Sequence, residues 1–194
     1  MGRLVKFFSI FVAVIGLSFV LSGCGGAKLS PTVQKAFDNN EKMYTQLNMH
    51  LNPGRGGIQT VETTNYSVGI LVPVNSEVVL SSVDAKKLIF TYNGMQVTLI
   101  NKAKYTGLNM EQTVNRYFSE KKVDLSKFSE MERSAIETAE VKAGISKEAM
   151  LVLRGYPPVH ATSSLKSDSW KFWENRWNTV LVQFENNKVT KITE

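Results

Sequence analysis

The sequence is poor in the residues on which most metal and redox sites depend. Its 194 residues include one cysteine, Cys24, and two histidines, His50 and His160. A single thiol allows no intramolecular disulfide, and two distant histidines without a cysteine pair match no common zinc-ligand spacing. We therefore expect no metal site, and stability that rests on a hydrophobic core alone.

Motifs for covalent and phosphate chemistry are also missing. There is no G-x-S-x-G, and the glycines of residues 52–57 are not followed by Lys-Ser or Lys-Thr at P-loop spacing. Ser119 and Lys122 satisfy S-x-x-K, but the companion motifs of serine acylases are lacking. Three carboxylates would form a glycosidase pair only if the fold brought two within about 5–9.5 Å; they are Asp168, Glu174 and Glu185. We predict no catalytic residues, no cofactor and no enzymatic activity.

Long apolar runs are scarce, and the one at the N-terminus is short. Residues 7–21 are apolar apart from two serines and a glycine, and Arg3 and Lys6 precede them. A helix that crosses a membrane needs about 20 apolar residues, so this run suits the apolar part of an export signal better than a membrane span. We expect residues 1–23 to be a signal peptide.

The four residues that end this segment carry a motif. Leu21-Ser22-Gly23-Cys24 resembles the bacterial lipobox, L-[AS]-[GA]-C, at every position. The resemblance implies cleavage after Gly23 and acylation of the Cys24 thiol and of the new amino group. Two or more acyl chains anchor a protein stably, at about 0.8 kcal/mol per buried methylene. Cys24 is therefore the predicted lipid attachment site, and a membrane is the predicted partner.

The residue after the cysteine and the charge of the chain bear on location. In bacteria with two membranes, an aspartate at this position tends to retain lipoproteins at the inner membrane, so Gly25 implies the outer membrane, facing the periplasm. Removal of the signal leaves a net charge of about +4, spread along the chain. Diffuse positive charge suits anionic lipid head groups or an acidic wall polymer, and it does not indicate nucleic acid.

The mature chain starts with a tether and a predicted helix, residues 24–57. Ser30 and Pro31 are typical of a helix start, and four apolar residues follow at helical spacing; they are Val33, Phe37, Tyr44 and Leu47. The breaker sequence NPGRGG at 52–57 marks a predicted boundary.

Residues 58–124 form a predicted β-rich module with a trailing helix. Strands are expected over 66–74 and 76–83, and a hairpin over 86–102 turns at Asn93-Gly94, which fits a type I′ turn. The stretch GILVPVNSEVVL resembles the first strands of bacterial SH3-like domains. A helix is expected from Met110 to about Lys121, with Asn109 as N-cap and Gln112 at N3.

Residues 125–194 form a second predicted α+β module. Ser146 and Gly155 fit the two ends of a short helix, and three alternating strands follow, with a turn at 186–187. One helix on such a meander buries one face of the sheet and leaves the other in solvent.

This order of residues is similar to the SmpA/OmlA (BamE-like) lipoprotein superfamily, over about fifty residues. The matching positions are Gly144, Ile145, Ser146, Met150, Gly155, Pro157, Trp170, Phe172, Phe184, Lys188 and Val189. The resemblance implies a helix with a three-stranded antiparallel meander, and an outer-membrane lipoprotein that binds partner proteins. The β-rich segment at 60–102 has no counterpart in the small BamE-like proteins.

Aromatic residues and arginine gather near the C-terminus. Trp173, Arg176, Trp177 and Tyr156 are the kinds of residue that interface cores prefer, and on a meander only alternate rings can enter the core. We predict that these four residues bind a partner.

Together these observations favour a lipid-anchored, non-catalytic interaction or scaffolding protein of the cell envelope, involved in outer-membrane assembly or integrity. A peptidoglycan-binding module that uses the SH3-like segment is the second hypothesis. An inhibitor of a periplasmic enzyme is the third, and it rests on analogy of fold.

The lipid anchor predicts a specific mature N-terminus. Because signal cleavage and acylation act on the same residue, mass spectrometry should find a chain that begins at Cys24 and carries acyl chains. An intact leader, or an unmodified sulfhydryl at residue 24, would contradict the envelope assignment.

Overall fold

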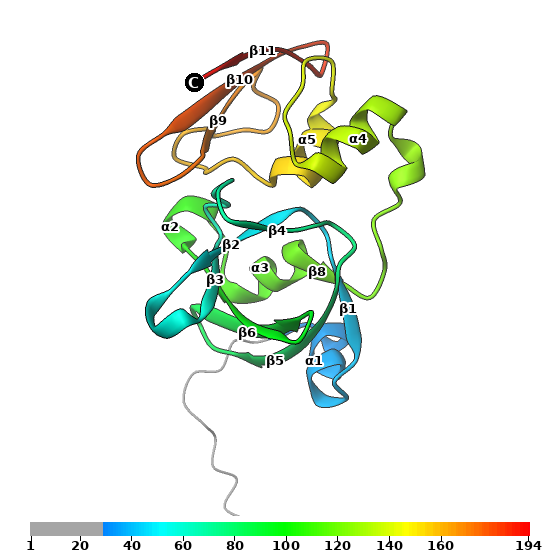
Figure 1. Ribbon diagram of the computed structural model, residues 1–194, viewed down its shortest axis with the longest axis vertical. Coiled ribbons are helices and arrows are strands. Elements are labelled where there is room, and N and C mark those ends of the chain that lie inside the picture. The colour runs from blue at the N-terminus through cyan, green and yellow to red at the C-terminus, as the bar shows by residue number, and fades with distance from the viewer. Residues whose placement is uncertain (1–28) are drawn as a thin grey trace, which may run out of the picture.

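A computed structural model describes residues 29–194, which form two lobes (Figure 1). The first lobe, residues 29–119, and the second lobe, residues 125–194, each have a cluster of buried apolar side chains. Helices and strands occur in both, so the α+β class is confirmed. The predicted signal peptide, cleavage motif and Cys24 lie outside the described residues. Within residues 29–194, no helix combines the length and apolarity needed to span a membrane.

The first lobe is an eight-stranded sheet in the order β4-β2-β3-β7-β6-β5-β1-β8. All neighbouring strands are antiparallel except β3 and β7, which are parallel. The strands are β1 (Lys42–Thr45), β2 (Met49–Pro53), β3 (Gln59–Glu62), β4 (Ile70–Val72), β5 (Glu77–Val83), β6 (Lys87–Tyr92), β7 (Met95–Ile100) and β8 (Phe118–Ser119).

The central hairpin, β6 and β7, follows the expected pattern. Asn93 and Gly94 have φ values of 47° and 76°, so the type I′ turn predicted from these residues is confirmed. Strict alternation places Leu88 and Phe90 on the buried face of β6. The same alternation buries alternate residues of β7, and the sheet gains one apolar face.

The strands curl around α3 (Met110–Tyr117), which lies inside the first lobe in Figure 1. Asn109 and Gln112 form the expected capping box. The helix ends at Tyr117, earlier than predicted, because Phe118 is extended and pairs with β1. The Phe118 ring lies 5.2 Å from the Phe90 ring. This contact holds the end of α3 in the core. A short helix, α2 (Ala103–Thr106), precedes α3.

The N-terminal helix is shorter than the spacing of apolar residues predicted. α1 covers Pro31–Asp38; Tyr44 lies in β1, and Leu47 lies in the turn before β2. Asn40 has φ 51°, a left-handed conformation in which a helix cannot continue. The expectation of a helix through residue 47 is therefore wrong.

The sheet also continues across the boundary predicted at residue 57. β2 and β3 pair with each other through a 3₁₀ turn, Arg55–Gly57. The breaker sequence therefore makes a turn within one sheet. The segment that resembles SH3-like domains supplies β4 and β5, which lie far apart in the sheet and do not pair.

The second lobe contains two helices and a three-stranded antiparallel sheet in the order β11-β10-β9. The elements are α4 (Glu130–Thr138), α5 (Lys147–Arg154), β9 (Ser169–Trp173), β10 (Thr179–Glu185) and β11 (Lys188–Thr193), with a 3₁₀ turn at Leu125–Lys127. Ser146 caps α5 and Gly155 follows it with φ 81°, as expected. The predicted helix and meander are confirmed, with Trp170 and Phe172 buried and Trp173 on the other face of β9.

A carboxylate joins the starts of α4 and α5. Glu132 accepts hydrogen bonds from the backbone N–H groups of Ser129 (2.9 Å) and Ser146 (2.8 Å). Partial burial opposes ionisation of this carboxyl, but the hydrogen bonds from Ser146 and Ser129 outweigh it and lower its pKa to about 2. The ionised side chain therefore fixes the loop that leads into α5.

The interface between the lobes is organised by Asn48, whose side chain is fully buried. Its amide nitrogen donates to the carbonyl of Ile136 (2.6 Å), and its amide oxygen accepts from the N–H of Val74 (2.7 Å). Its backbone N–H donates to the carbonyl of Val152 (2.9 Å). One residue therefore connects the first lobe to both helices of the second.

A second set of polar contacts lies beside it. The Asn65 side chain donates to the carbonyl of Arg154, and a Cβ at Gly155 would come within 2.5 Å of that amide nitrogen. The buried Arg154 side chain donates to the carbonyl of Trp173 (3.1 Å). Burial lowers the pKa of Arg154 to about 10, with Glu174 acting in the opposite direction. Burial, with the charge of Arg154, also lowers the pKa of His50 to about 4.

Replacement of Asn48 tests whether this interface stabilises the protein. Asn48→Ala leaves the Val74 N–H buried without a partner and removes one of the two hydrogen bonds to the Ile136 carbonyl, which still accepts from the Ala139 N–H. It should therefore lower the free energy of unfolding by about 1–3 kcal/mol. The exposed Asn115→Ala is the control, with an expected change below about 0.5 kcal/mol. Urea denaturation measures both, and equal values for the two variants would contradict this account.

Candidate binding cleft between the lobes

A cleft of about 540 Å³ lies where the two lobes meet. Residues from four separate segments line it: Glu62, Thr64, Tyr66, Lys102, Tyr105, Pro158, His160, Trp173 and Arg176. The first five belong to the first lobe and the last four to the second. Clefts of about 300–1,000 Å³ at such junctions are common ligand sites.

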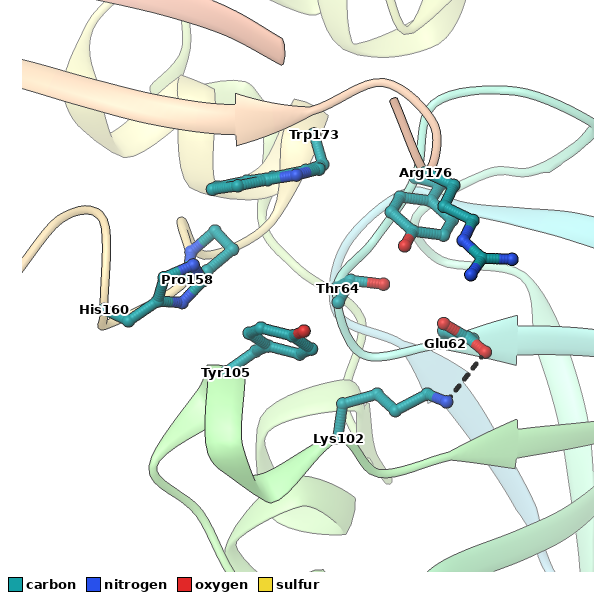
Figure 2. A pocket seen from close by; sticks show the side chains of 9 residues that line it. Glu62, Thr64, Lys102, Tyr105, Pro158, His160, Trp173 and Arg176 are labelled. Carbon is teal, nitrogen blue, oxygen red and sulfur yellow. Dashed lines mark ion pairs between the residues drawn. The ribbon is translucent and has the colours of Figure 1, made fainter. Parts of the chain in front are cut away.

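One end of the cleft is aromatic. Trp173 and Tyr105 enter it from opposite lobes, with Pro158 and His160 between them at one side (Figure 2). The His160 ring lies 4.9 Å from that of Tyr105 and 5.2 Å from that of Trp173. Because His160 contacts both of the other rings, the three rings give a continuous wall for a ring-shaped ligand.

The other end is charged. Lys102 Nζ lies 3.0 Å from a Glu62 carboxylate oxygen, and both side chains are about one-third exposed. Arg176 lines the same end (Figure 2), and it makes no ion pair with any carboxylate of residues 29–194. Two cations against one carboxylate leave this end with a net positive charge, which favours an anion.

A buried network holds the first-lobe wall. The Thr63 hydroxyl accepts from the backbone N–H of Lys102 (2.8 Å) and contacts the side-chain oxygen of Asn101 (3.3 Å). Asn101 in turn donates to the carbonyl of Leu108 (2.9 Å). These bonds fix the start of α2, and with it the positions of Lys102 and Tyr105.

Backbone hydrogen bonds fasten the second-lobe wall to the first. The N–H of Val159 donates to the Tyr105 carbonyl (2.8 Å), and the N–H of Ser67 donates to the Glu174 carbonyl (3.0 Å). In the turn between β9 and β10, the Asn175 side chain accepts from the N–H groups of Trp177 (2.8 Å) and of Asn178 (2.9 Å). The turn that carries Arg176 is therefore ordered by its own sequence.

Thr64 differs from the other residues of the cleft. It is only 6% exposed, and its hydroxyl has no hydrogen-bond partner among the described residues. Figure 2 shows this hydroxyl between the aromatic and charged ends. Because an unpaired buried hydroxyl costs free energy, a group that accepts or donates a hydrogen bond here would lower that cost.

The four residues predicted to bind a partner do not form one patch. Trp173 and Arg176 line the cleft. Trp177 is 81% exposed outside it, with the Arg176 guanidinium 5.1 Å from its ring. Tyr156 is half-buried beneath Arg116, whose guanidinium lies 3.9 Å from the tyrosine ring, and it packs against the first-lobe core.

Sequence reasoning did not identify Glu62, Tyr66, Lys102 and Tyr105 as site residues, because each follows an ordinary strand or loop pattern. His160, one of the two histidines, packs against rings of the cleft. Among the other groups considered for catalysis, Asp168 pairs with Lys147 (3.0 Å). Within residues 29–194, no group of three or more metal-ligating side chains comes together.

Comparison with protein-family models, curated proteins and solved structures finds no match to this chain.

Two neighbouring threonines test whether the Thr64 hydroxyl serves function rather than stability. Thr64→Val removes an unpaired buried hydroxyl and should raise the free energy of unfolding by about 1 kcal/mol. Thr63→Val removes a hydroxyl that is bonded to Lys102 N, and should lower it by about 1–3 kcal/mol. Thermal and urea denaturation give both values, and a loss of stability in Thr64→Val as large as in Thr63→Val would refute this reasoning.

Proposed function

We propose that this protein is a lipid-anchored component of the cell envelope that acts as a non-catalytic interaction or scaffolding module. The support for the anchor is the lipobox-like Leu21-Ser22-Gly23-Cys24 behind an export-signal pattern. Gly25 supports the outer membrane, facing the periplasm.

The observation that carries the interaction role is the exposure of Trp177. This ring is 81% exposed on a turn ordered by Asn175, and Arg176 lies beside it. A solvent-exposed ring forfeits burial free energy, about 25 cal/mol per Å² of apolar surface, until another molecule covers it. Tryptophan and arginine are also the residues most enriched at the energetic centres of protein interfaces.

The role is proposed as non-catalytic because of how the polar groups are used. Glu62 is paired with Lys102, and His160 packs against aromatic rings. The cleft lining includes neither serine nor cysteine, and the Thr64 hydroxyl makes no hydrogen bond to a base among the described residues.

The second lobe is proposed to be related to the SmpA/OmlA (BamE-like) superfamily. In support, the residues that carry the resemblance have structural roles: Ser146 caps α5, Gly155 ends it, and Trp170, Phe172 and Phe184 are buried in the core. Peptidoglycan binding remains the second candidate. For this function the cleft is a better candidate site than the SH3-like segment, because the two strands of that segment, β4 and β5, lie apart in the sheet.

A photo-crosslinking amino acid at position 177 tests the interaction role in intact cells. If the ring docks on a partner, crosslinking should give a discrete adduct. Cys24→Ala should reduce the amount of this adduct, because the protein is then no longer anchored to the membrane. A crosslinker at exposed Glu185, at the opposite end of β10, is the control and should give none. Failure to form an adduct at 177, or equal adducts at both positions, would refute the proposed partner face.

A further inference from the structure

We propose that the cleft between the lobes binds a muramyl-peptide ligand: a sugar ring that carries a short peptide with a free carboxylate, as in the repeating unit of peptidoglycan. This inference rests on the proposed envelope location, which sets the kind of molecule available. The binding residues belong to both lobes, and Trp177 lies outside the cleft, so the ligand site and the proposed partner face have only Arg176 in common.

The ring of such a ligand fits the aromatic end. A sugar presents C–H groups on its flat faces, and the negative faces of aromatic rings attract these groups. Trp173 from the second lobe and Tyr105 from the first face the same space, with His160 in contact with both rings. The sugar would lie against this wall.

The carboxylate fits the charged end. Lys102 is already paired with Glu62, whereas Arg176 has no carboxylate partner among residues 29–194. Arginine binds a carboxylate through two parallel hydrogen bonds, which lysine cannot do. Arg176 is therefore assigned to the carboxylate, and the Glu62–Lys102 pair limits the site to about one negative charge.

Thr64 supplies a polar contact between the two ends. Its side chain is more than nine-tenths buried and its hydroxyl has no partner in the described part of the chain. Sugar hydroxyls and an N-acetyl carbonyl provide the hydrogen-bond acceptors that this hydroxyl lacks. A neutral, apolar ligand would leave it unpaired.

The size of the cleft suits a fragment rather than a polymer. About 540 Å³ lies within the usual range for small-molecule sites, about 300–1,000 Å³. It accommodates one sugar with a short peptide. Because its walls come from different lobes, the ligand would contact both at once.

The test is a titration of the purified full-length protein in detergent with N-acetylmuramyl-L-alanyl-D-isoglutamine. Binding is measured by calorimetry and by tryptophan fluorescence, to which Trp173 contributes. Two probes divide the ligand: N-acetylglucosamine has the ring without the carboxylate, and L-alanyl-D-isoglutamine has the carboxylate without the ring. Saturable binding of the whole probe, with each half at least about tenfold weaker, is expected.

Three variants assign the contacts. Arg176→Gln should weaken binding about tenfold, because one charge-assisted contact is lost. Thr64→Val should also weaken binding, by a smaller factor, although it does not destabilise the fold. Lys121→Gln removes an exposed positive charge that does not line the cleft, and should bind like the unmodified protein. Circular dichroism and melting temperature show that each variant is folded.

Several results would overturn the inference. These are no binding of the whole probe at about 1 mM, equal binding by Arg176→Gln, or tighter binding of a peptide with a C-terminal aromatic residue. Acylation of Cys24 is measured on the same preparation. Binding by an unacylated protein would refute the anchor and leave the cleft assignment standing, whereas an acylated protein that does not bind would refute only the cleft assignment.

Discussion

The buried side chain of Asn48 is the contact on which the relative position of the two lobes depends. Its amide bonds the Val74 N–H and the Ile136 carbonyl, and its backbone reaches Val152 in α5. A buried amide is favourable only when its hydrogen bonds are made. Because its partners lie in separate segments, they are made together in only one arrangement of the lobes. The Asn65 contact with Arg154, beside Gly155, imposes the same arrangement from the other side.

The cleft follows from this constraint. Its aromatic wall has members from both lobes, and its charged end joins Glu62 and Lys102 to Arg176. A small rotation between lobes would separate these groups, so the polar interface positions the cleft without lining it. The exposed Trp177 and the ligand cleft share one turn, ordered by Asn175. A partner that covers Trp177 would therefore lie next to the mouth of the cleft.

Local elements were predictable where their signals lie within a few residues. The Asn93-Gly94 hairpin, the Asn109 capping box and the Ser146 cap of α5 all appear where expected, because each depends on residues two or three positions apart. The spacing of apolar residues predicted the wrong element where sheet pairing competed with helix formation. Tyr44 lies at helical spacing from Val33 and Phe37, yet its backbone pairs with β5. The breaker sequence at 52–57 does form a turn, but the sheet continues across it from β2 to β3, because the same residues make turns within a sheet and boundaries between modules.

By itself the sequence determined the α+β class and the helix-plus-meander of the second lobe, because contiguous residues carry these signals. It also predicts lipid attachment at Cys24, from four contiguous residues. Only the tertiary structure decided which of the aromatic residues face a cleft. Trp173 and Arg176 line the cleft, whereas Tyr156 packs against the first-lobe core. Tyr105 and Lys102, from a distant segment of the chain, complete the cleft lining. The physical reason is that the cleft exists only between two lobes, and their approach is set by hydrogen bonds of buried residues that no local pattern in the chain encodes.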